Sequence, residues 1–368
     1  MIRNLTAFFL GSVAVVGIGT PATAELKFDN DSGGYVKLYG QFSPTYQSVD
    51  DGVETKNTLV DNAHSNSRVG LWVNQPFAAG TFTFNFETAL GFRQSDGVSQ
   101  TSTPDAFDWQ KTSLRKVDFA FQGAGWGKVF VGQGSMATDG VAQYDLGSNG
   151  MTTYNGISDF TGSFQFRTAA GALSGITIGS ALPSLDGGRR GRVRYDTPDF
   201  NGFYVSVAAG TEILVDGNDD DFYDIALKYS GDINGTEVIG GIGFSRRDSN
   251  GVKTDDTIGS LAVKFQSGLN LAVAAGSRDN DGSYQYVKAG YEIDLIPMGE
   301  TAFAIDYYDG SDFGLQGRDS SSLGVGVNQD IDSANAQIYL GYRTHELGDP
   351  GVAYRDVDAY LFGARWKF

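Results

Sequence analysis

The sequence predicts an all-β protein, a transmembrane antiparallel β-barrel, and three observations point to it. Apolar and polar side chains alternate with a period of two along most of the chain after residue 24. Short turns alternate with long polar connections, as in barrels that put short turns on one membrane side and long loops on the other. The chain ends on an aromatic residue, Phe368, inside an alternating stretch. That ending is expected if the last strand pairs with the first and closes the sheet.

The alternation is clearest around residue 192. Arg190, Arg192 and Arg194 have one parity, and Val193 and Tyr195 have the other. Successive side chains of a strand point to opposite faces of the sheet. A soluble sheet would bury the apolar face, whereas a membrane barrel turns that face to lipid and its charged face to an aqueous lumen. We therefore expect three arginines on the inner wall.

The connections favour a barrel over a β-sandwich, which would not sort its loops by length. No linker or short-period repeat divides the chain, which predicts one barrel domain over residues 25–368. Short connections are expected at 76–80, 123–127, 198–202, 231–235, 267–268, 294–299 and 329–333, and long ones at 48–67, 93–112, 135–160, 213–220, 248–254, 309–319 and 346–353.

Residues 1–24 have the pattern of a secretory signal peptide. Arg3 is followed by a short apolar run at 8–19 and by an A-x-A site that ends at Ala24. The run is too short for a transmembrane helix, which needs about 20 apolar residues. The mature chain is expected to start at Glu25 and to be exported.

Composition narrows the function further. The net charge of −17 argues against nucleic acid as a partner, which would require a basic face. The chain has no cysteine, so an exported fold must be held together without disulfides, as a closed sheet can be. Its 51 glycines, 8 prolines, 18 tyrosines and 25 phenylalanines fit strands and tight turns better than helices.

Five stretches stand out by their order and spacing: residues 35–40 (YVKLYG), 67–71 (SRVGL), 126–132 (WGKVFVG), 193–203 (VRYDTPDFNGF) and 361–368 (LFGARWKF). Together they resemble the general porins of Gram-negative outer membranes. The resemblance implies a 16-stranded barrel, usually a trimer, that lies in outer-membrane lipid and lipopolysaccharide and passes small hydrophilic solutes. It also implies that the C-terminal strand, with Trp366 and Phe368, is the signal for the outer-membrane assembly machinery.

In this family the third loop folds into the lumen and sets its narrowest point with carboxylates that face arginines on the wall. Here that loop would run from about Gly134 to Gly188. Asp159, in ISDFTG at 157–162, carries over from the family pattern, Asp145 does so more weakly, and Asp139 is added for its proximity.

The basic wall is expected to contain Arg68, by its motif, together with Arg190, Arg192 and Arg194. In the fourth strand Arg115 has the parity of Val117, so Lys116 is the better lumen candidate. Gln133, a position often basic in the family, departs from the pattern. The predicted basic wall thus consists of Arg68, Lys116, Arg190, Arg192 and Arg194.

A second departure is an insertion at 163–181. Phe164 and Phe166, followed by Ile176 and Ile178, indicate a hairpin. Counted as wall strands, its two arms would give 18 strands; counted as part of the loop, they leave 16. The match of residues 192–203 to the strand after the loop favours 16.

Opposed charges across a narrow aqueous gap create a transverse field, which polar solutes cross more easily than apolar ones. The sequence thus predicts passive diffusion and no catalysis. The ion preference stays open, because acidic loops favour cations while inner arginines favour anions. The alternatives are a substrate-selective porin for anions or sugars and, less favoured, a secreted β-rich adhesin.

Other chemistry has weak support. Neither histidine, His64 or His345, has a catalytic partner at a known spacing, and both are expected in solvated loops. Asp216, Asn218 and Asp220 occupy positions 1, 3 and 5 of a Ca²⁺-loop pattern that then fails at positions 6 and 12. Loop-bound Ca²⁺ at the rim is therefore a weak candidate, and no other cofactor is expected.

Overall fold

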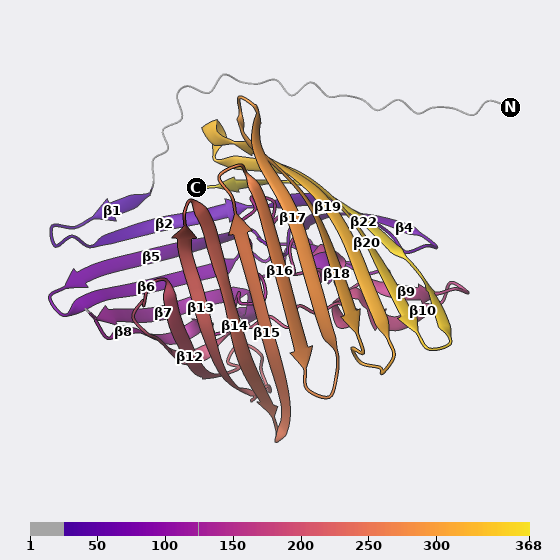
Figure 1. Cartoon of the computed structure of the whole chain (residues 1–368), viewed down its shortest axis with the longest axis horizontal. Helices are drawn as coiled ribbons and strands as arrows, with labels where there is room; N and C mark the ends of the chain where they lie inside the picture. Colours follow the sequence, from indigo (N-terminus) through magenta and orange to yellow (C-terminus); the bar gives the residue numbers. More distant parts are fainter. Residues whose placement is uncertain (1–25, 124) are drawn as a thin grey trace.

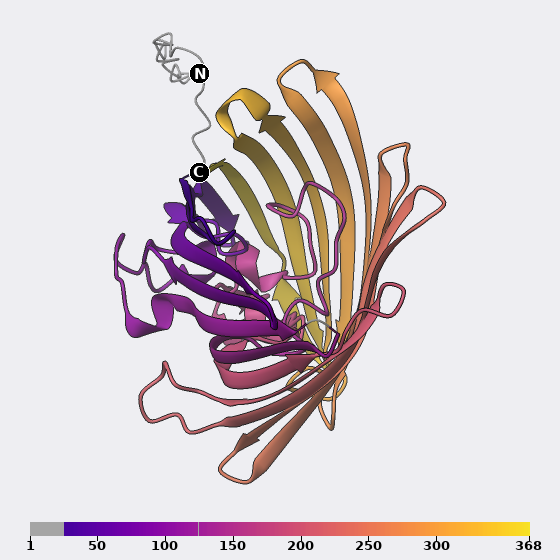
Figure 2. The same cartoon turned by 90° about the vertical axis from the view of Figure 1, so that its left-hand side faces the viewer.

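The computed structural model describes residues 26–123 and 125–368, which form a closed antiparallel barrel of 16 strands (Figures 1 and 2). The predicted signal peptide, residues 1–24, lies outside the described residues. The first wall strand is β2 (Tyr35–Phe42) continued by β3 (Pro44–Asp50), and the second is β4 (Thr55–Asp61) continued by β5 (Arg68–Phe77).

Each of the other wall strands pairs antiparallel with the next wall strand along the chain, which confirms the predicted antiparallel barrel. They are β6 (Gly80–Ala89), β7 (Leu114–Gly123), β8 (Gly127–Ser135), β11 (Arg189–Asp196), β12 (Phe203–Thr211), β13 (Asp221–Ile233), β14 (Thr236–Ser249), β15 (Val252–Lys264), β16 (Leu269–Arg278), β17 (Ser283–Ile296), β18 (Gly299–Ser311), β19 (Asp319–Ile331), β20 (Ala336–Asp349) and β22 (Val357–Lys367).

Four short strands lie outside this wall. β1 (Lys27–Asp29) pairs with β2, β21 (Val352–Arg355) pairs with the end of β20, and β9 (Gln165–Thr168) and β10 (Leu173–Thr177) form a hairpin. β8 pairs directly with β11, so the hairpin is not inserted into the wall. The prediction of 16 strands is confirmed and the alternative of 18 is wrong.

The barrel closes where β22 meets the first strand, as the aromatic C-terminus predicted. β22 pairs with β3 and with the end of β2, and Gly40 and Phe368 exchange backbone hydrogen bonds of 3.0 and 3.1 Å. Phe42 stacks on Trp366 at 6.1 Å and lies 5.9 Å from Phe368. The three rings cover the closing seam on its outer face.

The predicted short connections whose residues are all described are tight turns. In the β13–β14 turn Asn234 and Gly235 both have positive φ, 55° and 83°, as a type I′ turn requires. Three predicted long loops are wrong in part, because strands cover half of 48–67 and most of 248–254 and 346–353. The second ends in another tight turn, at Asn250 and Gly251, and opposite charges on its arms pair across the ladder.

The two faces of the wall have the expected polarity. Val193 is 56 % exposed on the outside, whereas Arg192 next to it is 4 % exposed on the inside. The described helices are all short: α1 (Ser158–Thr161), α2 (Ile178–Ala181), η1 (Ser95–Gly97), η2 (Lys111–Ser113) and η3 (Asp332–Ala334). Over the described residues, no helix has the length and apolar character needed to cross a membrane.

Candidate functional site in the lumen

The loop between β8 and β11, residues 136–188 and called L3 below, folds into the lumen as predicted (Figure 2). The Asp224 carboxylate of β13 accepts hydrogen bonds from the backbone and hydroxyl of Thr138, at 2.8 and 2.7 Å. The Ser260 hydroxyl of β15 donates to the Val141 carbonyl at 2.6 Å. L3 thus starts along the inner wall of β13–β15. Farther along L3, the Ser148 amide donates a hydrogen bond to Glu292 of β17.

L3 has an apolar core of its own inside the barrel. Ile157, Phe164, Phe166, Ile178 and Leu182 are all at most 1 % exposed and belong to one cluster with inner-wall side chains of the last strands. Burial of several large apolar side chains is worth roughly 1.5–3 kcal/mol each. L3 is therefore a packed element that fills part of the lumen.

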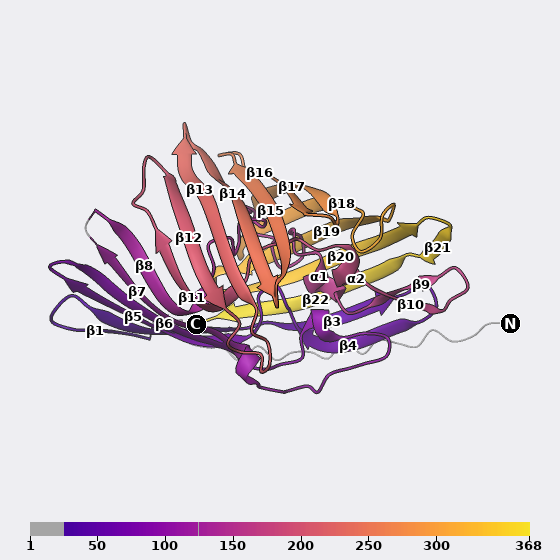
Figure 3. The same ribbon diagram turned by 90° about the horizontal axis from the view of Figure 1, so that it is seen from below.

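The inserted hairpin β9–β10 reaches the rim of the barrel (Figure 3). β9 pairs with β21, in the last long connection. Arg167 of β9 forms ion pairs of 2.6 Å with Asp51 and Glu54, at the tip of the first long hairpin. The insertion thus ties L3 to the first and last rim connections and leaves the wall unchanged.

The predicted acidic residues of L3 are held in three different ways. Asp145 is paired with Lys288 of β17, and Asp139 lies 3.8 Å from Arg189. Asp159, in α1, accepts a hydrogen bond from the Tyr154 hydroxyl. None of the three forms an ion pair, within the described chain, with the five basic residues predicted for the wall. Their role at the narrowest point stays a prediction.

Arg190, Arg192 and Arg194 of β11, called the arginine ladder below, lie on the inner wall as predicted. Each of these arginines also has a carboxylate close to it. Arg192 forms two hydrogen bonds of 2.9 Å with Asp118 of β7, and its side chain is 1 % exposed. Arg194 binds Asp196 in the same two-point way, at 2.7 and 2.8 Å. Arg190 lies 3.6 Å from Glu212 and 4.0 Å over the ring of Phe222.

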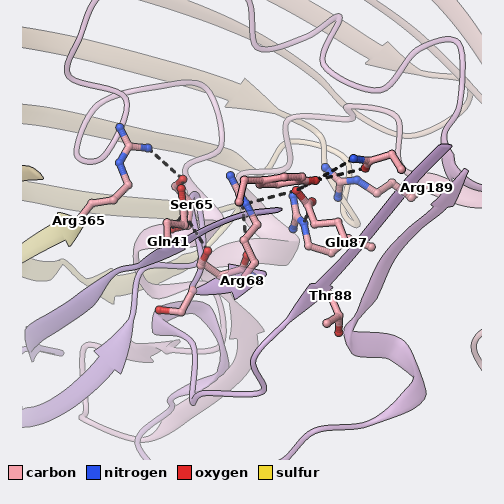
Figure 4. Close-up of polar contacts among 12 residues, drawn as sticks. Gln41, Ser65, Arg68, Glu87, Thr88, Arg189 and Arg365 are labelled. Carbon is pink, nitrogen blue, oxygen red and sulfur yellow. Dashed lines mark hydrogen bonds and ion pairs between the residues drawn. The ribbon is translucent and has the colours of Figure 1, made fainter. Parts of the chain in front are cut away.

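A second group of basic side chains lies at the first wall strands, where Arg68 and Arg115 share one carboxylate, Glu87 (Figure 4). The nitrogen–oxygen distances are 3.6 Å from Arg68 and 2.6 Å from Arg115. Tyr39 also donates to Glu87, at 3.0 Å. In the described part of the chain, no carboxylate lies within ion-pair distance of Lys116 or Arg365. We call Arg68, Arg115, Lys116, Arg189 and Arg365 the basic cluster.

The basic cluster is accessible from the lumen. The side chains of Arg68 and Arg115 are each 20 % exposed and that of Arg189 is 33 % exposed, against 1 % for Arg192. Arg365 is fixed by a 3.0 Å hydrogen bond to the Ser65 hydroxyl, and Gln41 donates to the same hydroxyl at 2.9 Å (Figure 4). Ions in the lumen therefore meet this cluster more readily than Arg192.

The parity argument that excluded Arg115 is wrong because the ladder is interrupted there. Glu87 is opposite Lys116, but Thr88 is opposite Leu114, so Arg115 is an extra residue in β7. Such a β-bulge changes the direction of side chains in the strand. Arg115 and Lys116 both enter the basic cluster as a result. Arg189 and Arg365 had no sequence signal beyond their strand positions.

Burial changes the acid–base behaviour of L3. Together with the neighbouring Asp96 of the β6–β7 loop, it raises the pKa of Asp159 to about 8. Burial likewise raises the pKa of Asp96 to about 6. At neutral pH the Asp159 carboxyl is therefore mostly protonated and adds little negative charge to the lumen.

The structure also shows where His345 and the three residues of the Ca²⁺-loop pattern lie. The prediction of a solvated loop is wrong for His345, which is fully buried in β20 with Nε2 3.1 Å from the Thr161 hydroxyl. Asp216 pairs with Lys111 at 2.6 Å, and Asn218 accepts from the Asp220 backbone at 2.9 Å. Over the described residues, no three His, Cys, Asp or Glu side chains are grouped as metal ligands. Calcium binding at this loop stays a prediction.

The sequence matches the family model described as Gram-negative porin over residues 11–350. The chain belongs to the Gram-negative porin family. Membership, together with the closed barrel, establishes an outer-membrane channel for passive diffusion. None of the curated proteins compared with this porin matches it in sequence.

Solved structures have the same fold at low sequence identity. The anion-selective porin from Comamonas acidovorans aligns with a TM-score of 0.61 and 16 % identity, over 91 % of this chain and 100 % of its own. OprB of Pseudomonas putida gives 0.60 and 11 %, over 90 % and 94 %. OmpF of Salmonella typhi gives 0.56 and 12 %, over 92 % and 99 %. At these identities the likeness shows the fold alone.

Proposed function

We propose that this porin passes small hydrophilic solutes and prefers anions at neutral pH. The basic cluster carries the proposal, because its partly exposed cations outnumber the carboxylates near them. A unit charge about 4–8 Å from an ion in water changes its free energy by about 0.5–1 kcal/mol. Each cluster charge beside the passage would then change the anion-to-cation permeability ratio about two- to fivefold.

The test is the reversal potential of single channels in a planar bilayer under a KCl gradient. Wild type is expected to prefer chloride, and Arg115→Gln to lower that preference. Arg278→Gln is the matched control, since Arg278 has a carboxylate of its own, Asp256, at 2.7 Å near the outer rim. Cation preference in wild type, or equal effects of the two variants, would contradict the proposal.

A solute-selective porin is the second candidate, and one cavity favours it. A hollow of about 210 Å³ lies at the start of β11, lined by Arg190, Arg247, Phe222 and Asp186 among others. It offers donors, acceptors and an aromatic side chain, which suit a hydroxylated solute. Saturable block of the current by a sugar or sugar acid, weakened by Arg247→Gln, would support this candidate. Unblocked current at all concentrations would exclude it.

We further propose a homotrimer. Aromatic side chains pack together on the outer face of β6–β8, with Phe84 and Phe119 at 4.7 Å and Phe121 and Trp126 at 6.1 Å. A trimer form is named for a structural neighbour, OmpT of Vibrio cholerae, whose sequence is 14 % identical. Conductance steps in threes and a trimer band in unheated detergent gels are expected. Single steps with a monomer band would contradict this.

Export and assembly complete the proposal. We expect removal of residues 1–24, so that the protein in the membrane begins at Glu25, which N-terminal sequencing checks. Recognition by the assembly machinery is expected to require Phe368, and deletion of that residue should reduce the amount of folded barrel in the membrane. Contacts with lipid and lipopolysaccharide are expected on the apolar outer face, and no catalytic step is part of the proposed activity.

A further inference from the structure

The α1 segment of L3 is held in place by contacts with titratable side chains. Both histidines of the chain are involved. The ring of His64 lies 3.7 Å from that of Tyr154, and the Tyr154 hydroxyl donates to the Asp159 carboxyl. On the other side of α1, His345 contacts the hydroxyl of Thr161. Burial lowers the pKa of His64 to about 3, so this ring stays neutral, and the group whose ionisation bears on the docking of L3 is Asp159.

The surface that receives α1 is the loop between β6 and β7, residues 90–113, called L2 below. The Ser95 hydroxyl of η1 donates to the Asp159 carbonyl at 2.5 Å, and the Ser163 amide donates to the Asp96 carbonyl at 2.9 Å. These contacts hold the carboxyl groups of Asp96 and Asp159 in one desolvated region.

Charged and titratable side chains from several neighbouring elements face Asp96 and Asp159. Asp96 comes from L2, Arg115 from β7 and His64 from the segment between β4 and β5, where it touches Tyr154. Arg343 of β20 lies 5.8 Å from the ring of Phe160 but is bound to Asp306 at 2.7 Å. No described basic side chain lies within 4 Å of the Asp159 carboxylate. An ionised Asp159 would thus lack an ion-pair partner.

We propose that the docking of α1 on L2 is a proton-sensitive latch, closed while Asp159 is protonated and loosened when Asp159 ionises. The inference rests on the anion preference proposed above, because ionisation would also place a negative charge near Arg115 of the basic cluster. Loosening of α1 and loss of anion preference are expected together.

The sign and range of the effect follow from burial. Two carboxylates in a desolvated region repel, so ionisation of Asp159 opposes docking. The pKa of Asp159 is raised to about 8, whereas an undocked, solvated carboxyl has its ordinary value of 3.8. Docking weakens as the pH rises from 3.8 to about 8, by about tenfold for each pH unit. Above about pH 8 the docked carboxyl is ionised too, and the dependence ends.

One test follows docking without using conductance. Wild type has no cysteine, so Thr161→Cys places a single buried thiol in α1. The rate at which a water-soluble reagent labels this thiol is measured at each pH and compared with the rate in Thr161→Cys/Asp159→Asn. The ratio of the two rates removes the effect of pH on the ionisation of the thiol itself. The ratio of the two rates is expected to rise between pH 6 and 8 by about tenfold or more. A ratio independent of pH would overturn the latch.

The second test uses single channels in a KCl gradient from pH 6 to 9. Wild type is expected to lose anion preference over this range, Asp159→Asn to keep it, and Asp145→Asn to keep the pH dependence of wild type. A preference that changes equally in wild type and Asp159→Asn would also overturn the latch. A channel with no anion preference at any pH would contradict the proposed function instead, while the labelling test would still judge the latch.

Discussion

The two halves of the barrel wall use their inner charges differently. In the first half, strands β5–β8 have nine or ten residues, and Arg68 and Arg115 share Glu87. In the second half, strands β17–β20 have 13 or 14 residues, and cations such as Arg343 and Lys288 each have a carboxylate of their own. L3 starts along that second half and packs its apolar core there.

This difference separates the stability of the barrel from its ion preference. Where L3 covers the wall, water is excluded and each charge needs a partner, since an unpaired buried charge is costly. Where the wall borders the passage, water screens the charges, and an excess of one sign is tolerated. We expect substitutions in the second half to change folding and those in the first half to change permeation.

The largest effect is expected for Asp306→Ala. Asp306 and Arg343 form an ion pair whose side chains are 0 % and 1 % exposed, so the variant leaves a buried arginine unpaired. Loss of one partner of such a pair costs about 3–5 kcal/mol in the free energy of unfolding. Urea unfolding in detergent or lipid measures it. Arg68→Ala, in the basic cluster, should cost about 1 kcal/mol or less, and equal losses would remove the distinction between the halves.

The next effect concerns permeation. Glu87→Gln removes the carboxylate that Arg68 and Arg115 share, so the anion-to-cation permeability ratio should rise about two- to fivefold. The reversal potential in a salt gradient measures the ratio. Asp256→Asn is the counterpart in the second half and frees Arg278 near the outer rim, where the effect should be smaller. If Asp256→Asn changed the permeability ratio more than Glu87→Gln does, the narrow region of the pore would not lie beside the basic cluster.

A pH dependence is expected at the ends of L3, where Asp186 accepts hydrogen bonds from the backbones of Gly140 and Ala142 at 2.7 and 2.8 Å. Burial, with help from Asp139, raises the pKa of Asp186 from 3.8 to about 7. Between these values the folded protein holds a proton that the unfolded chain has released, so the free energy of unfolding falls as pH rises. Urea midpoints at pH 5 and 8 should differ less in Asp186→Asn than in wild type. An equal difference would rule out this contribution.

The smallest effect is expected for Arg192→Gln. Arg192 is bound at two points by Asp118 and is almost inaccessible, so the permeability ratio should change less than twofold. The same bilayer measurement decides. A change as large as that of Arg115→Gln would mean that the arginine ladder also borders the passage.

Much of the fold was predictable because each strand carries its own alternation of polar and apolar side chains. Arg192 and Val193 face inward and outward as their parity predicts, and Phe368 lies at the closing seam. Strand ends were less predictable. Polar residues such as Asp248 and Lys253 were interpreted as loop, but they pair across a hairpin that continues the ladder. Polarity alone does not distinguish a solvated loop from a solvated extension of two strands.

The lumen was less predictable, because its contacts join residues far apart in the chain. Parity excluded Arg115, and only the bulge opposite Glu87 turns it inward. Asp159 was expected to face arginines as an anion, but burial beside Asp96 keeps it largely protonated at neutral pH. His345 was expected in a solvated loop, but L3 covers it.

The sequence by itself determined the barrel, the order and parity of its strands, the residues that form L3 and the family resemblance. These properties are local or periodic, and each depends on a few neighbouring side chains. The tertiary structure decided the count of 16 strands, the pairing of the insertion with the rim, and which charges keep carboxylates of their own. Those properties depend on register and on long-range packing within the lumen, which no single stretch of the chain specifies.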